Sequence, residues 1–187
     1  MITTLDEHTA LVLIDLQHGI VDMAKSAAAP VVENAARLVH AFRKANLPIV
    51  IVNVNPTTSP INALRKEANA PAFEIPGGWL DIVPEIRSTT QDIFITKNTW
   101  NAFTNPSLYI ELKKRNVSGI VLAGISTSIG VEGTARRASE LGYNLTFAQD
   151  AMADLFPEAH QHSLKYIFPR IGELGSTKEI IDVLESR

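Results

Sequence analysis

The feature of this chain that most constrains its fold is a series of short apolar segments rich in β-branched residues. They occur at residues 10–14, 49–54, 93–96, 119–122 and 145–148. None of them alternates strictly between apolar and polar residues, and such segments are typical of parallel strands buried on both faces of a sheet. We therefore expect these five segments to be strands of one parallel sheet.

Helical patterns occupy the segments between these strands. Residues 30–46 place apolar side chains on one face, begin with a proline and end at Leu47-Pro48. Further helices are expected at residues 107–115, 132–141, 157–167 and 177–184. Alternating strands and helices are typical of a three-layer α/β fold with right-handed crossovers. With 187 residues, the chain is expected to form a single domain, 1–187.

Composition excludes several classes of function. The formal net charge is -3 and no long cluster of Lys and Arg occurs, which argues against nucleic acid or an anionic membrane surface as a partner. No apolar segment is long enough to span a bilayer, and no export signal is visible at the N-terminus. The sequence contains no cysteine, which excludes disulfides, thiolate metal sites and thiol catalysis. These features fit a cytoplasmic protein.

Two charged residues stand where strands are expected to end. In sheets of this kind, ligands bind beyond the carboxyl ends of the strands. A carboxylate there, such as Asp15, loses hydration, which raises its pKa and suits a proton donor. The alternative is that Asp15 caps a helix or binds a backbone amide. Lys97 could meet Asp15 across the strand ends and hold a substrate carboxylate, or it could be an exposed loop lysine.

A turn of small and hydroxyl-bearing residues connects the strand at 119–122 to the helix at 132–141. Such a junction directs the backbone amides of Ser126 to Gly130 at one spot, where an anion or oxyanion can bind. The hydroxyls of Ser126, Thr127 and Ser128 have two interpretations. One of them could be a nucleophile with a histidine as its base, or they could cap the helix that follows.

The remaining candidate residues are aromatic or lie in a long connection. Trp79, Trp100 and Phe103 lie near strand ends, where they could wall a pocket, anchor loops or contact another subunit. The connection at residues 55–91 is long for a compact domain and is expected to be functional or to bind a partner. The five histidines show no metal-ligand spacing, so we expect neither a metal nor another cofactor.

Taken together, these motifs resemble the isochorismatase-like hydrolases (cysteine hydrolases) over nearly the whole chain. The first-strand motif with its catalytic aspartate matches residues 13–17, and the catalytic lysine and its following Ala-Phe pair match Lys97 and 102–103. The nucleophile loop and its helix match residues 124–136. Three C-terminal landmarks match residues 150–151, 158–160 and 168–170.

The resemblance implies a doubly wound sheet of about six parallel strands and a homodimer or higher homo-oligomer. It also implies a cis peptide bond between Ile125 and Ser126. Within these motifs, we expect Gln17, Ile125, Ser126 and Ile129 to contact a small-molecule substrate together with Trp79, Trp100 and Phe103.

The sequence departs from the family pattern at the nucleophile. Gly130 stands where most members carry cysteine, so the acyl-enzyme route of the amide-cleaving relatives is blocked. The metal site of nicotinamidases is also missing, because the matching stretch reads Asn53-Val-Asn55-Pro56-Thr57. True isochorismatases of the family can carry glycine at this position, because a vinyl ether is cleaved by protonation of carbon rather than by a nucleophile.

The expected function is therefore acid-catalysed hydrolysis of the vinyl ether of isochorismate or a similar small carboxylate, with release of pyruvate. Asp15 would be the general acid, Lys97 would orient substrate and Gly130 would leave room for it. The two carboxylates of isochorismate call for a second cation, with Arg65, Lys66 and Arg87 as candidates. The alternatives are an amide hydrolase with a substitute hydroxyl nucleophile and an inactive ligand-binding or oligomeric member of the family.

Overall fold

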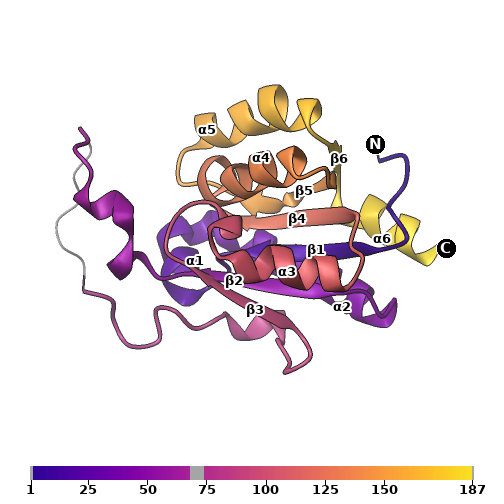
Figure 1. Ribbon diagram of the computed structural model, residues 1–187, viewed down its shortest axis with the longest axis horizontal. Coiled ribbons are helices and arrows are strands. Elements are labelled where there is room, and N and C mark those ends of the chain that lie inside the picture. The colour runs from indigo at the N-terminus through magenta and orange to yellow at the C-terminus, as the bar shows by residue number, and fades with distance from the viewer. Residues whose placement is uncertain (1, 68–73, 187) are drawn as a thin grey trace.

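The computed structural model describes residues 2–67 and 74–186, and its centre is a six-stranded sheet (Figure 1). Every neighbouring pair of strands is parallel, and the strand order is β3-β2-β1-β4-β5-β6. The strands are β1 (Thr9–Ile14), β2 (Ile49–Val54), β3 (Ile93–Lys97), β4 (Gly119–Ile125), β5 (Asn144–Ala153) and β6 (Glu173–Gly175). The expected doubly wound parallel sheet is confirmed.

The chain builds this sheet outward from β1 in two directions. It adds β2 and β3 on one side, returns to pair β4 with β1, and then adds β5 and β6 on the other side. All residues of β1 and β4 are buried, because these central strands have covering helices on both faces. The order of the strands reverses between β1 and β4, and open α/β sheets bind ligands at such a point.

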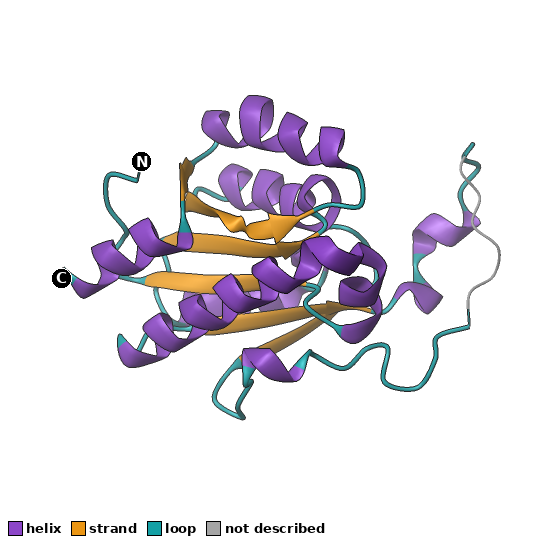
Figure 2. Cartoon of the chain, turned by 180° about the vertical axis from the view of Figure 1, so that it is seen from behind, coloured by secondary structure: helices purple, strands orange, loops and turns teal. Residues whose placement is uncertain are grey.

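Helices cover both faces of the sheet (Figures 1 and 2). One core contains apolar side chains of α1 (His18–Ala24), α2 (Ala28–Lys44) and α6 (Thr177–Glu185). The core on the opposite face contains side chains of α3 (Pro106–Lys114) and α4 (Glu132–Glu140), together with Phe168. No helix within the described residues is long and apolar enough to cross a membrane.

The structure differs from the expected elements at several boundaries. It adds α1 and the short strand β6, neither of which the sequence pattern indicates. Strand β5 continues to Ala153 after a shift in its register with β4, although exposed Gln149 and Asp150 interrupt its apolar pattern. The expected helix at 157–167 is α5 (Pro157–His162) followed by a π-helical turn at Ser163–Ile167.

The long connection between β2 and β3 divides into two parts. After β2, two 3-10 turns at Pro56–Thr58 and Pro60–Ala63 extend away from the body at the carboxyl edge of the sheet (Figure 1). The returning part packs against the body, where Ile82 forms an isolated antiparallel bridge with Gln17. A third 3-10 turn at Pro84–Ile86 then leads toward β3.

Candidate functional site

Asp15 lies directly beyond the carboxyl end of β1, next to the point where the strand order reverses. Its backbone has a φ of 55°, in the left-handed region that aspartate tolerates better than most residues. Its amide donates to the Val52 carbonyl at 2.9 Å, which fixes the residue against β2. The side chain is turned inward, and only 4% of the residue is exposed. An unusual backbone conformation at a buried acid is frequent at functional sites.

Lys97 ends β3 and meets Asp15 across the end of β2. Its Nζ donates to Asp15 Oδ2 at 2.6 Å and to the Thr99 carbonyl at 3.1 Å. Only 3% of Lys97 is exposed. The alternatives of an exposed lysine and of a helix-capping aspartate are therefore both wrong. Two charges from opposite sides of β2 form one buried pair.

The two oxygens of the Asp15 carboxyl group have different surroundings. Oδ2 accepts the Lys97 hydrogen bond, whereas Oδ1 is buried and has no hydrogen-bond partner among the described residues. Burial raises the pKa of Asp15 to about 6, although the Lys97 ammonium acts in the opposite direction. A proton on this group would sit on Oδ1, because Oδ2 already faces a donor. When Asp15 is protonated, its proton is therefore directed away from the Lys97 ammonium.

Gly130 faces this pair from the turn between β4 and α4. A β-carbon at Gly130 would lie 3.1 Å from Asp15 Oδ2 and 3.7 Å from Lys97 Nζ. The turn is π-helical at Thr127–Val131, and the Thr134 hydroxyl holds it by donating to the Gly130 carbonyl at 2.7 Å. The same hydroxyl accepts from the Ala102 amide at 3.0 Å. Gly130 is therefore fixed with its bare α-carbon toward the acid.

The turn offers fewer free amides than its sequence suggests. The Ser128 amide donates to Asp154 Oδ2 at 2.7 Å, and the Ile129 amide donates to the Ser126 carbonyl at 3.2 Å. Of the expected set from Ser126 to Gly130, only the amides of Ser126, Thr127 and Gly130 are left as candidates for binding an anion. The peptide bond between Ile125 and Ser126 is cis, at the position that the family resemblance implied.

The Thr127 hydroxyl is paired with a histidine, but its geometry does not suit a nucleophile. Its Oγ1 donates to the Ala153 carbonyl at 3.0 Å, so the His160 Nδ1 at 2.8 Å must be the donor in their hydrogen bond. Thr127 is completely buried. Burial lowers the pKa of His160, and the charge of Asp154 opposes this effect. The cluster connects the turn to α5 and the end of β5.

Two of the expected substrate contacts support the site from inside the core. Gln17 is completely buried, and its amide group forms hydrogen bonds with both the N–H and the C=O of Val54, at 2.7 and 3.0 Å. Ile125 is completely buried in the core on the α2 face. Ser126 and Ile129 are partly exposed on the turn itself.

The three aromatic candidates separate into two loop anchors and one exposed residue. Trp79 lies so close to α1 that a β-carbon at Gly19 would be 1.9 Å from its ring. Phe103 stacks on Tyr143 with ring centroids 6.1 Å apart. Trp100 is 56% exposed and lies over Gly133, one helical turn beyond Gly130. Sequence reasoning missed the exposed residues Leu155 and Phe156. Asp154 connects their loop to the turn, because its Oδ1 accepts the Phe156 amide and its Oδ2 accepts the Ser128 amide.

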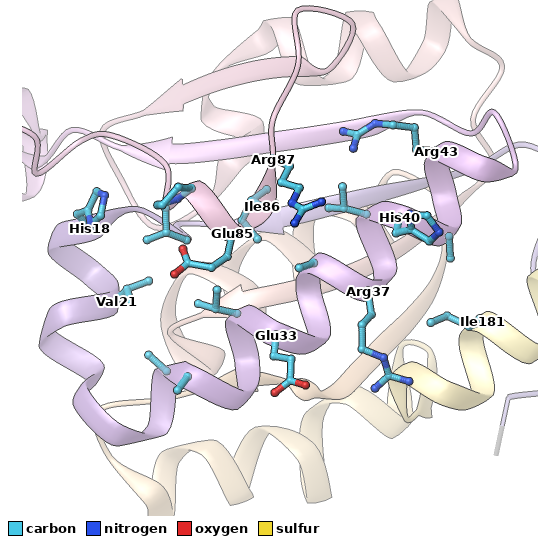
Figure 3. A pocket seen from close by; sticks show the side chains of 18 of the residues that line it. His18, Val21, Glu33, Arg37, His40, Arg43, Glu85, Ile86, Arg87 and Ile181 are labelled. Carbon is cyan, nitrogen blue, oxygen red and sulfur yellow. The ribbon is translucent and has the colours of Figure 1, made fainter.

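The candidate second cations lie elsewhere. Arg87 follows the 3-10 turn at Pro84–Ile86 and lines a groove of 1160 Å³ with α1, α2 and α6 (Figure 3). Lys66 donates to the Ile61 carbonyl at 3.0 Å in the extended segment, and Arg65 is exposed beside it. The groove of 1160 Å³ beside Arg87 is lined by neither Asp15 nor Lys97, so the size of a groove does not by itself locate the site. In the described part of the chain, no three His, Asp or Glu side chains gather to hold a metal ion.

Known proteins are similar to this chain over almost its whole length. The profile described as "Isochorismatase domain" matches residues 9–179. The chain is 43% identical over 180 residues to the uncharacterized isochorismatase family protein YwoC of Bacillus subtilis, covering 94% of each chain. An isochorismatase family protein from Burkholderia thailandensis superimposes with a TM-score of 0.89 at 34% identity, over 99% of this chain and 100% of that one.

More distant relatives have names that describe amide hydrolysis. The ureidoacrylate amidohydrolase RutB of Acinetobacter baylyi is 28% identical, over 96% of this chain and 84% of its own length. Nicotinamidase 3 of Arabidopsis thaliana is 28% identical, over 83% of this chain and 78% of its own.

Proposed function

The chain belongs to the isochorismatase family of hydrolases, and on that premise we propose that it cleaves the vinyl ether of isochorismate or a similar small carboxylate, releasing pyruvate. The observation that carries this proposal is the buried Oδ1 of Asp15, which has no hydrogen-bond partner in the part of the chain that the structure describes. A general acid needs a proton that is held near neutral pH and aimed at the reacting atom. Burial raises the pKa of Asp15 and so holds the proton near neutral pH. Because Oδ1 bonds no described residue, a proton on it can be aimed at the substrate.

The reaction proceeds by proton transfer from oxygen to carbon. The O–H bond at Asp15 Oδ1 breaks as a C–H bond forms at the terminal alkene carbon, which leaves an oxocarbenium ion and an Asp15 carboxylate. The Lys97 ammonium stabilises this new negative charge at 2.6 Å. Water then adds to the cationic carbon and returns a proton to Asp15. The C–O bond between the hemiketal carbon and the alcohol oxygen then breaks, the hemiketal hydroxyl proton passes to that oxygen, and pyruvate and the free alcohol are released.

Lys97 has a second role in binding substrate. Its charge favours ionised Asp15, which would remove the reactive proton. A substrate carboxylate that binds Lys97 neutralises this effect and holds the alkene next to Oδ1. Gly130 contributes by lacking a side chain, since a β-carbon there would already crowd Ile14 Cγ2 at 2.9 Å and Asp15 Oδ2 at 3.1 Å. We further propose that the protein acts in the cytoplasm as a homo-oligomer, on the basis of its cysteine-free composition and the family resemblance.

Amide hydrolysis is the second candidate, because the names of RutB and nicotinamidase 3 describe it. The site offers it little support. Gly130 supplies no nucleophile, and the Thr127 hydroxyl is buried and donates to a backbone carbonyl. A nucleophile would have to be Ser126, Ser128 or water.

A direct assay separates these possibilities. Purified protein is incubated with isochorismate, and pyruvate is measured with a coupled dehydrogenase, with Asp15→Asn as the control. Parallel incubations contain ureidoacrylate and nicotinamide, and ammonia release is measured. Pyruvate from wild type but not from Asp15→Asn supports the proposal. Ammonia without pyruvate overturns it in favour of amide hydrolysis, and binding without either product favours a non-catalytic protein.

A further inference from the structure

We propose that the substrate of this site carries a single carboxylate and that the rest of the molecule is uncharged. This inference rests on the proposed function and defines the substrate class as an enolpyruvyl ether of a neutral alcohol, in which the enolpyruvyl carboxylate is the only negative group. It narrows the proposed class to its members with one carboxylate and predicts that isochorismate, whose second carboxylate would need its own partner in the site, is a poorer substrate than a monocarboxylate.

The first argument is the charge available around Asp15. Among the described residues, the only charged residues that are buried as a whole are Asp15, Lys97 and Asp154, and the buried side chain of Asp92 is paired with Arg43 away from the site. Asp154 is acidic and accepts hydrogen bonds from the amides of Ser128 and Phe156, so it cannot hold an anion. When Asp15 carries its proton, Lys97 is the one buried cation, and it balances one negative charge. A second desolvated carboxylate would be left without a partner.

The second argument is the number of hydrogens on Lys97. An ammonium group has three N–H donors. One is directed at Asp15 Oδ2 and a second at the Thr99 carbonyl. A single donor is left for a ligand, which suits one carboxylate oxygen.

The third argument is the neutral character of the surroundings. A cavity of 340 Å³ reaches Lys97, and its other lining residues are all uncharged: Asn55, Thr58, Thr96, Asn98, Thr104, Asn105 and Pro106. On the surface, exposed Trp100 lies beside the turn that carries Gly130, and Leu155 and Phe156 are held to the same turn through Asp154.

A matched pair of substrates tests the charge count. The compounds are 2-phenoxyacrylate and 3-(1-carboxyvinyloxy)benzoate, which differ by one ring carboxylate and release pyruvate with phenol or 3-hydroxybenzoate. We expect kcat/KM to be at least about tenfold higher for the monocarboxylate, because the extra charge loses its hydration without gaining a partner. Equal values, or a preference for the dicarboxylate, would overturn the inference.

Binding of unreactive analogues separates this inference from the proposed function. The saturated compounds 2-phenoxypropanoate and 3-(1-carboxyethoxy)benzoate are titrated into wild-type protein by calorimetry. If neither acrylate releases pyruvate but the monocarboxylate analogue binds more tightly, vinyl-ether hydrolysis fails and the single-charge site stands. If the dicarboxylate binds as tightly, or if neither analogue binds, the single-charge site is wrong.

An added cation provides an independent test. Trp100→Arg places a positive charge beside the turn, and we expect it to reduce the preference for the monocarboxylate by at least about threefold through its attraction for the ring carboxylate. Phe94→Arg is the control, because Phe94 is 54% exposed, close to the 56% of Trp100, but lies within β3. The control should keep the wild-type ratio. An unchanged ratio in Trp100→Arg, or an equal change in both variants, would contradict the placement of Trp100 beside the substrate.

Discussion

Gly130 faces Asp15 so closely that a β-carbon at position 130 would lie 3.1 Å from the carboxyl Oδ2. The same carbon would lie 2.9 Å from Cγ2 of Ile14, which is shorter than ordinary carbon contacts. The position that the family resemblance assigns to the nucleophile is therefore directly adjacent to the acid. In this chain, we interpret the absence of a side chain at Gly130 as what keeps the packing around the acid undisturbed.

Gly130→Ala tests that interpretation. The added methyl group should lower kcat/KM by at least about tenfold, since a displacement of about 1 Å at a reacting group can reduce rates by a hundredfold. Overpacking against Ile14 should also lower the free energy of unfolding by about 1–3 kcal/mol. Gly133→Ala is the matched control, because its β-carbon would have no neighbour closer than 3.6 Å. Steady-state kinetics measure the change in kcat/KM, and thermal melts measure the change in stability. Full activity in Gly130→Ala would show that a methyl group beside Asp15 does not disturb the reaction.

Asp15→Asn tests the general acid. Asparagine has nearly the same shape and tolerates a φ of 55°, but its amide cannot donate a proton to carbon. We expect kcat to fall by about a thousandfold, within the usual range for loss of a general acid. Asp92→Asn is the control, because the Asp92 side chain is equally buried and pairs with Arg43 at 3.0 Å, away from the site. Retained turnover in Asp15→Asn, measured as pyruvate release, would remove Asp15 from the mechanism.

The pH dependence follows from the pKa of Asp15, which burial raises to about 6 from an ordinary 3.8. The protonated form is the active acid, so kcat/KM should be level at low pH and fall about tenfold per pH unit above pH 6. The folded protein holds this proton more tightly than the unfolded chain. Its contribution to stability is therefore complete below pH 3.8 and is lost as pH rises to about 6.

Two measurements check these signs. The first is the pH profile of kcat/KM with a substrate whose own carboxylate stays ionised. The second is urea unfolding of wild type and Asp15→Asn, in which wild type should lose stability relative to the variant between about pH 4 and pH 6. A rate that increases above pH 6 would instead indicate a general base.

Thr127→Val tests whether the buried threonine positions the turn. Valine keeps the shape but removes the hydrogen bonds to the Ala153 carbonyl and His160 Nδ1. We expect a loss of about 1–3 kcal/mol in stability and a decrease in kcat with little change in KM. Thr177→Val is the control, because Thr177 is also completely buried and its hydroxyl bonds Asp150 at the start of α6. A decrease of kcat in both variants would mean that general loosening, not the turn, is responsible.

Much of the fold follows from the sequence because the central strands are buried on both faces. Unbroken apolar segments therefore predict β1 to β3 to within one residue and β4 except for its last three residues. The carboxyl-edge rule places Asp15 and Lys97 at strand ends where they can meet, and the structure confirms that they do. Helix α1 escaped prediction because Gly19 weakens its helical pattern, and that glycine is explained only by the Trp79 ring that lies against it.

The parts of the site that the sequence does not predict depend on contacts between distant residues. The Ser128 amide is occupied by Asp154, which lies 26 positions later and after an interrupted strand. Gln17 looks like a polar residue at a strand end, but its partner is the backbone of Val54. No local pattern encodes such pairings. They decide which amides and side chains remain for a ligand.

The strand order gives the Asp15–Lys97 bridge a mechanical consequence. Asp15 extends from a central strand, whereas Lys97 belongs to β3, the outermost strand on its side of the sheet. Local opening of an edge strand costs less free energy than opening the interior of a protein. Peeling of β3 alone would separate the cation from its acid while the rest of the sheet stayed intact. Under mildly denaturing conditions the enzyme should lose its activity while its overall fold still persists.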